Sequence, residues 1–159
     1  FSKEHLSEEL KGEFLLWVKL HPAVRNHVGL EEYEGMIKDV SDLPLKDLLH
    51  ASDVLISDYS SIPFEYALLD KPMLFYTYDL KEYDKKRGLI DGYEAVIPGK
   101  ACLTRGMLLE ELKNIHHVHE EIKRFSYEWN EYSHGDASRK LLEFIEQQML
   151  EGKKRPACS

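Results

Sequence analysis

The tetrapeptide Asp58-Tyr59-Ser60-Ser61 combines two adjacent hydroxyls with a position where a helix is predicted to begin. It follows an apolar run, and Pro63 stands two residues after the second serine. Proline is favoured in the first turn of a helix, where its missing N–H group breaks no hydrogen bond. The unpaired N–H groups of that turn, together with serine hydroxyls, can hold a phosphate. The alternative is a plain strand-to-helix turn in which Ser61 is the N-cap.

Polar residues also follow two earlier apolar runs: Lys19 and His21 follow the first, and Ser41 and Asp42 follow the second. In a cleft, a histidine can hydrogen-bond to a diphosphate leaving group or stabilise its charge. The alternative for His21 is a structural histidine with satisfied hydrogen bonds. Glu65 does not stand three residues after either serine, so no capping box holds it and it is predicted to point into the cleft.

Short apolar runs alternate with helical patterns, which predicts a parallel sheet covered by helices on both sides. The predicted strands are residues 14–20, 36–40, 53–57 and 72–76, with a weaker fifth at 95–97. The predicted helices are residues 43–51, 63–69, 107–128 and about 137–149. Ligands of an open parallel sheet bind beyond the carboxyl ends of the strands, so we expect His21, Ser41 and Ser60 on one rim.

The composition sets limits on function. The chain has 159 residues, 43% of them hydrophobic, which is typical of one globular domain, and a formal net charge of -8. This charge provides no overall basic field for a polyanion, so nucleic-acid binding is not expected. No segment approaches the roughly 20 apolar residues that a membrane-spanning helix needs.

Cysteine and histidine residues do not form an obvious framework in this sequence. Cys102 and Cys158 are too few for a disulfide scaffold, and we expect two reduced thiols in a cytoplasmic protein. His116 and His119 share one face of a predicted helix, beside His117, but no carboxylate or cysteine is placed as an evident third ligand. We therefore predict no metal site, and no motif indicates a cofactor.

A series of motifs resembles the C-terminal domain of the CDP-glycerol glycerophosphotransferase family, the teichoic-acid primases and polymerases of Gram-positive bacteria. The motifs are KLHP from Lys19, DVSDLPLKDLL from Asp39, DVLISDYSSIPFEYALLDKPMLFYTYDLKEY from Asp53, Arg87-Gly88, and WNEYS from Trp129 with Gly135. They extend over nearly the whole chain in the family's order. The central block, with DYSS before a helix and YDLxxY after the next strand, is the most specific part.

The resemblance implies a Rossmann-like domain, the C-terminal half of a two-domain GT-B transferase. Residues 1–150 would form the donor-binding domain and residues 151–159 a polar tail. The enzyme would be peripheral, on the cytoplasmic face of the membrane. It would transfer glycerol phosphate, or a related polyol phosphate, from CDP-glycerol to a lipid-linked glycan acceptor by direct displacement of CMP.

The resemblance also implies roles for individual residues. It assigns His21 to the donor phosphates, as the catalytic residue of this chain, and Ser60 and Ser61 to the diphosphate. The other predicted binding residues are Ser41 and its neighbour Asp42, near the base, Glu65, at the ribose, and Lys19.

Two parts of the family pattern have no counterpart in this sequence: the first strand of the domain and the N-terminal domain, which is expected to supply the general base. The chain is therefore expected to be a piece of a longer one, inactive alone but able to bind cytidine nucleotides weakly. In the 3-2-1-4-5-6 strand order the missing strand lies at the centre of the sheet, so two strand edges are expected to lack a partner.

Other functions remain open at the level of sequence. One is a different GT-B nucleotide-sugar transferase or epimerase, although YDLxxY argues against it. Another is a non-catalytic nucleotide-binding module. Within the teichoic-acid family, the sequence does not decide between a glycerol and a ribitol donor, or between priming and polymerisation.

Overall fold

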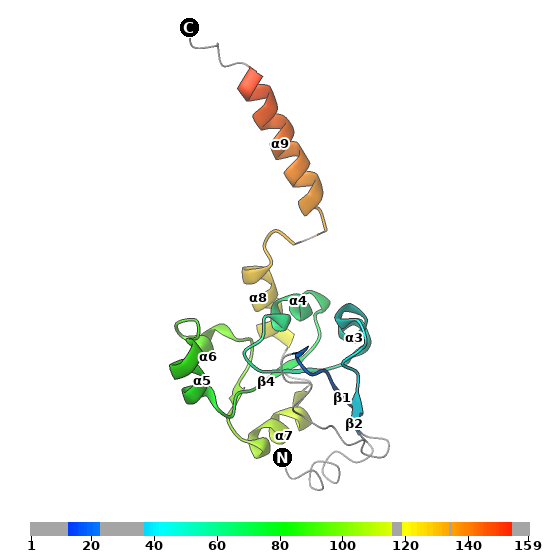
Figure 1. The fold of residues 1–159 in the computed structure, drawn as a ribbon, viewed down its shortest axis with the longest axis vertical. Helices are drawn as coiled ribbons and strands as arrows, with labels where there is room; N and C mark the ends of the chain where they lie inside the picture. The colour runs from blue at the N-terminus through cyan, green and yellow to red at the C-terminus, as the bar shows by residue number, and fades with distance from the viewer. Residues whose placement is uncertain (1–12, 23–36, 116–118, 134, 154–159) are drawn as a thin grey trace. The chain divides into compact units, whose positions relative to one another are not determined.

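The computed structural model of the chain describes residues 13–22, 37–115, 119–133 and 135–153. The chain divides into two compact units, residues 1–51 and residues 52–159. Among the described residues, each unit contains its own parallel sheet, with two strands in the first and three in the second (Figure 1). No described helix is long and apolar enough to cross a membrane.

The first unit consists of a strand pair and a helix. Strand β1 (Leu16–Val18) pairs in parallel with β2 (Ile37–Asp39). Helix α3 (Leu45–Ala51) follows and buries two leucines at adjacent positions, Leu48 and Leu49. Both strands lie within the predicted ranges 14–20 and 36–40, and the helix begins two residues inside the predicted 43–51, so these three predictions are confirmed.

The sheet of the second unit has the order β3-β4-β5, and all its pairs are parallel. The strands are β3 (Leu55–Ser57), β4 (Met73–Tyr76) and β5 (Ala101–Cys102). The central strand β4 is apolar throughout, and its first three residues are buried, as expected for a strand covered on both faces. Figure 1 shows α7 (Arg105–Lys113) on one side of this sheet and α4 (Ile62–Tyr66) with α8 (His119–Trp129) on the other.

The described strands form two separate parallel sheets. Among the described residues, β1 pairs with β2 alone and β3 pairs with β4 alone. The predicted α/β fold with parallel strands and flanking helices is therefore confirmed, but the described strands form two sheets instead of one.

The predicted fifth strand at 95–97 is wrong. Residues Tyr93–Val96 form helix α6. Gly92 starts this helix with a left-handed backbone (φ 72°), and its carbonyl accepts from the N–H groups of Ala95 and Val96 at 2.7 and 3.2 Å. A run of three apolar residues has too few positions to distinguish a strand from a helical turn. The fifth strand is β5, a few residues later.

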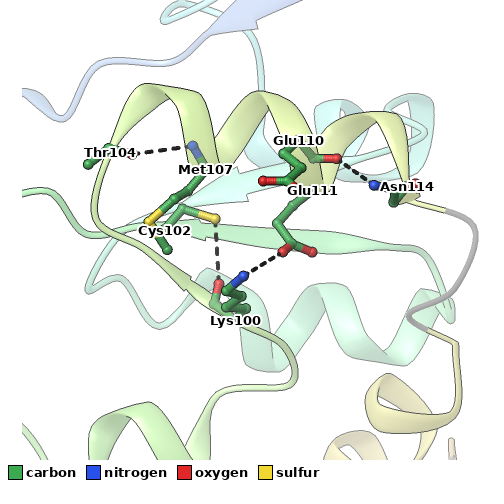
Figure 2. Close-up of polar contacts among 7 residues, drawn as sticks. All are labelled: Lys100, Cys102, Thr104, Met107, Glu110, Glu111 and Asn114. Atoms are coloured by element: carbon green, nitrogen blue, oxygen red, sulfur yellow. Dashed lines mark hydrogen bonds and ion pairs between the residues drawn. The ribbon is translucent and has the colours of Figure 1, made fainter.

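The predicted helix 107–128 is two helices, α7 and α8. Helix α7 ends at Lys113, and the side-chain amide of the C-cap residue Asn114 donates to the Glu110 carbonyl at 3.0 Å (Figure 2). The apolar stripe was nevertheless predicted correctly, because all five of its residues are buried: Leu108, Leu112, Ile115, Ile122 and Phe125. The last helix, α9 (Ala137–Lys153), extends beyond the predicted end at Met149 into the predicted polar tail.

Side chains of the residues that flank β5 contact α7 (Figure 2). Thr104 caps α7 by accepting from the Met107 N–H at 3.3 Å, and Lys100 forms an ion pair with Glu111 at 3.1 Å. Cys102 is a buried free thiol whose Sγ lies 3.7 Å from the Lys100 carbonyl oxygen. Burial raises the pKa of this thiol, so it is poorly suited to act as a nucleophile. Cys158 lies outside the described residues.

Candidate functional site

The carboxyl ends of β1 and β2 are joined by two of the predicted binding residues. The Lys19 ammonium donates to the carbonyl oxygens of Ser41 at 2.9 Å and Leu43 at 2.7 Å. The Ser41 hydroxyl accepts from the Leu20 N–H at 2.9 Å. The structure therefore brings Lys19 and Ser41 together and gives both a structural role that the sequence did not predict.

The other predicted residues of this unit flank those contacts. His21 lies two residues beyond Lys19 and Asp42 directly after Ser41, and both are exposed. The Ser41 N–H donates to Asp39 Oδ1 at 2.8 Å, which closes a tight turn after β2. Two candidate binding residues, His21 and Asp42, thus lie directly beside strand ends that are joined by hydrogen bonds.

The serine pair follows β3, as predicted, and leads into α4 with Pro63 in the first turn. Ser61 occupies the N-cap position, but its side chain makes no capping hydrogen bond. The Ser60 hydroxyl instead accepts from the Ile62 N–H at 3.1 Å. Ser61 is therefore the N-cap residue, as the alternative predicted, but its hydroxyl makes no capping hydrogen bond.

Helix α4 is short, with five residues followed by the 3-10 turn η1 (Ala67–Leu69). A helix dipole grows with the number of aligned peptide units. Any phosphate bound here would consequently depend more on the serine hydroxyls than on the dipole. Glu65, the predicted ribose contact, is exposed in the first turn of this helix.

Helix α8 packs against α4, the helix that follows residues 58–61, which we call the serine turn. The ring centroid of Phe64 lies 5.1 Å from that of Phe125 and 5.1 Å from that of Trp129. The side-chain amide of Asn130 donates to the Phe64 carbonyl at 2.9 Å, across 66 residues of sequence. The WNEYS motif from Trp129, which had no assigned role, thus begins with two residues that hold α4 in place.

A group of aromatic residues holds the segment just before the serines. The Tyr59 hydroxyl donates to Asp79 Oδ1 at 2.8 Å, and its ring stacks on Tyr83 at a centroid distance of 3.8 Å. Tyr93 lies tilted against the same ring. We call Tyr59, Asp79, Tyr83 and Tyr93 the tyrosine cluster. Sequence reasoning missed these contacts, although it grouped DYSS with YDLxxY, the motif that contains Asp79 and Tyr83.

Lys71, at the start of the KP motif, holds the segment that enters β3. Its ammonium donates to the Ser52 carbonyl at 2.7 Å, and the buried Tyr66 hydroxyl donates to the same oxygen at 3.2 Å. Burial raises the pKa of Tyr66, so this phenol remains a donor.

Two predictions about the site concern either residues of both units or side chains that the structure does not describe. The shared rim of His21, Ser41 and Ser60 would combine residues of both units, so it stays a prediction. The predicted lack of a metal site concerned His116 and His117, which lie outside the described residues, and His119, whose side chain is likewise not described.

Comparison with known proteins gives consistent matches along the chain. A family model described as CDP-glycerol:poly(glycerophosphate) glycerophosphotransferase matches residues 1–147. The teichoic acid glycerol-phosphate primase of Bacillus spizizenii is 57% identical over 145 residues, which are 91% of this chain and 38% of the primase. The teichoic acid poly(ribitol-phosphate) polymerase of the same species is 36% identical, over 89% of this chain and 23% of the polymerase.

Solved structures of the wall teichoic acid polymerase TagF are also similar. One has a TM-score of 0.75 at 31% identity and covers 96% of this chain and 39% of the TagF chain. A TagF variant soaked with CDPG has a TM-score of 0.74, covering 95% of this chain and 38% of that one. The chain therefore spans less than half the length of the relatives and solved structures that it matches.

Proposed function

The chain belongs to the CDP-glycerol:poly(glycerophosphate) glycerophosphotransferase family, and on that premise we propose that it forms the donor-binding part of a longer transferase of teichoic-acid synthesis. The primases of Bacillus spizizenii and Bacillus subtilis are 57% and 51% identical to it, against 36% for the ribitol-phosphate polymerase. This order favours CDP-glycerol as the donor and priming as the reaction. We call the longer chain of this proposal the full-length transferase.

The observation that carries the proposal is the serine turn at the end of β3. Ser60 and Ser61 lie beyond the carboxyl end of a parallel strand, where α/β proteins bind ligands. The Ser61 hydroxyl makes no capping bond and can donate to a phosphate oxygen. A hydrogen bond to a charged oxygen is stronger than one between neutral groups. Helix α8 also packs against α4, so the position of the hydroxyls is fixed before a ligand binds.

The proposed reaction is a direct displacement at phosphorus. An acceptor hydroxyl oxygen attacks the glycerol-bound phosphorus of CDP-glycerol, and the bond between that phosphorus and the bridging oxygen of CMP breaks. CMP leaves with the electron pair, and the acceptor proton passes to a base that this chain does not supply. Positioning and neutralisation of charge provide most of the catalysis.

The residues of this chain act on the donor in the proposed mechanism. His21 and the two serines stabilise the negative charge of the diphosphate and of the departing CMP. Asp42 and Ser41 lie near the base, Glu65 reaches the ribose, and Lys19 acts by holding Ser41. In the full-length transferase this donor-binding half joins a second domain in a GT-B arrangement, peripheral to the cytoplasmic face of the membrane, where the lipid-linked acceptor lies.

The test is donor use by the full-length transferase. We expect glycerol phosphate transfer from CDP-glycerol to exceed ribitol phosphate transfer from CDP-ribitol, measured with a lipid-linked acceptor. Calorimetry of the 159-residue chain should show weak binding of CDP and CMP, and weaker binding of UDP and ADP. A transferase that uses a UDP-sugar instead, or a chain that binds all four nucleotides equally, would contradict the proposal.

A further inference from the structure

The tyrosine cluster fixes the segment that precedes the serines through contacts from outside that segment. The hydrogen bond between Tyr59 and Asp79 spans 20 residues of sequence. Asp79 is the N-cap residue of α5 (Leu80–Arg87), yet its side chain makes no capping bond there. An aspartate at this position ordinarily accepts from an N–H group of its own helix. Here the carboxylate accepts from Tyr59 instead.

Two further contacts act on the same segment. The Tyr59 and Tyr83 rings stack with an interplanar angle of 22°. The Tyr93 hydroxyl donates to the backbone carbonyl of Asp58 at 3.0 Å. Helices α5 and α6 therefore hold both Asp58 and Tyr59, the two residues that lead directly into Ser60.

The two phenols of the cluster that form hydrogen bonds, those of Tyr59 and Tyr93, are uncharged at neutral pH. Burial, and then the neighbouring Asp79, raise the pKa of Tyr59 far above its ordinary value. Burial also raises the pKa of Tyr93, to about 12. Both phenols remain hydrogen-bond donors at neutral pH. They consequently hold the segment without adding negative charge next to the serines that we propose to contact a diphosphate.

The cluster is distinct from the hydrophobic core of the unit. Tyr66 and Phe75 are 0% and 1% exposed, whereas Tyr59, Tyr83 and Tyr93 are each only partly buried. Partly buried rings remove less apolar surface from water and add less to stability. Polar and stacking contacts that meet on two consecutive residues are better explained by a requirement to fix the backbone there.

We propose that Tyr59, held by Asp79 and Tyr83, is a positioning residue that sets the direction of the Ser60 and Ser61 hydroxyls toward the donor diphosphate. This inference rests on the proposed function, in which those hydroxyls contact the donor. A mobile turn would have to be ordered when the donor binds, and that ordering weakens affinity. Tyr59 orders the turn in advance.

The test uses Tyr59→Phe in the full-length transferase, because phenylalanine keeps the stacked ring and removes only the hydroxyl. We expect the KM for CDP-glycerol to rise about tenfold, with kcat and the acceptor KM changed by less than about twofold. Asp79→Asn keeps a side-chain oxygen that can accept, so it should raise the donor KM less than Asp79→Ala does. Tyr127→Phe is the matched control, because it removes the same atom from a tyrosine that is 72% exposed.

The outcomes separate this inference from the proposed function. An unchanged donor KM in Tyr59→Phe, in a transferase that Ser61→Ala impairs, would overturn the positioning role alone. A rise in both donor and acceptor KM with a lower Tm would show a merely structural role and would also overturn it. No transfer from CDP-glycerol by the unsubstituted transferase would overturn both.

Discussion

At the carboxyl ends of β1 and β2, Lys19 and Ser41 form hydrogen bonds with the neighbouring backbone, whereas at the end of β3 the hydroxyl of the N-cap residue Ser61 makes no capping bond. Lys19 and Ser41 make three such bonds between the two strand ends of the first unit. In the second unit, Tyr59 bonds to the Asp79 side chain, and Ser61 does not cap α4. Residues of similar type and position thus serve different purposes.

The packing also differs between the serine turn and strand β1. The serine turn is supported by Phe64, Phe125 and Trp129 and by the Asn130 amide. In β1, Trp17 is 36% exposed, and the preceding Leu15 is 51% exposed. Because Lys19 and Ser41 bond to the backbone, the loss of either side chain should affect stability, whereas the loss of the Ser61 hydroxyl should affect donor binding.

The largest effect is expected from removing the aromatic support of the serine turn. Phe125 is 4% exposed and contacts Phe64. Phe125→Ala should lower the free energy of unfolding by about 3–5 kcal/mol, because it removes buried apolar surface and leaves a cavity. Denaturant unfolding of the full-length transferase measures this. Tyr127→Ala, on the exposed face of the same helix, should change it by less than about 0.5 kcal/mol, and equal losses would show that α8 does not support α4 as described.

The next effect concerns donor binding by the serines. Ser61→Ala should weaken CDP-glycerol binding by about 1.5–3 kcal/mol, the usual contribution of a hydrogen bond to a charged group. It should leave stability unchanged, because the hydroxyl makes no capping bond. Ser60→Ala should weaken donor binding by a similar amount and also lower stability, since it removes the acceptor of the Ile62 N–H. Donor titrations and thermal unfolding separate the two effects.

Ser133→Ala is the control for these variants, since Ser133 is exposed and lies outside the site. A Ser61→Ala transferase with unchanged donor affinity would remove the main support for a phosphate site at this turn. A large loss of stability in that variant would instead mean that the hydroxyl has a structural bond after all.

Sequence reasoning located the serine turn because its signals are local. An apolar run, two hydroxyls and Pro63 occupy consecutive positions, and their order determines a strand end followed by a helix start. The positions of the first four strands were predictable for the same reason. The contacts of Tyr59 were not accessible, because they connect residues 20 or more positions apart, and no local pattern marks which tyrosine meets which carboxylate.

The errors in the predicted elements have a similar cause. The end of α7 depends on Asn114 bonding back to Glu110, while the apolar stripe continues through it into α8. The apolar stripe predicts correctly which residues are buried, but it does not indicate where one helix ends and the next begins. The structural use of Lys19 and Ser41 was missed because the same residue types suit ligand binding and strand-end bonding equally well.

A smaller effect is expected at the first strand pair. Ser41→Ala leaves the partly buried Leu20 N–H without its acceptor. It should lower the free energy of unfolding by about 1 kcal/mol, the usual net value of one hydrogen bond. Ser41→Thr keeps the hydroxyl and should be close to the unsubstituted protein. If Ser41→Ala instead weakens donor binding as strongly as Ser61→Ala while stability is preserved, the contrast between the two strand ends is wrong.

The smallest effect is confined to alkaline pH and to the tyrosine cluster. Burial raises the pKa of Tyr93 from 10.0 to about 12. Between these values the unfolded chain loses this proton while the folded chain keeps it, so the contribution of the neutral phenol is intact below pH 10 and is lost as pH rises through 12. Tyr93→Phe has no such proton, so its stability should fall less steeply across this interval. The slope is the measurement, because losing the bond to the Asp58 carbonyl lowers stability by a constant amount at every pH. Parallel slopes for the two proteins would mean that Tyr93 titrates alike in the folded and unfolded states, and that the cluster does not shield it.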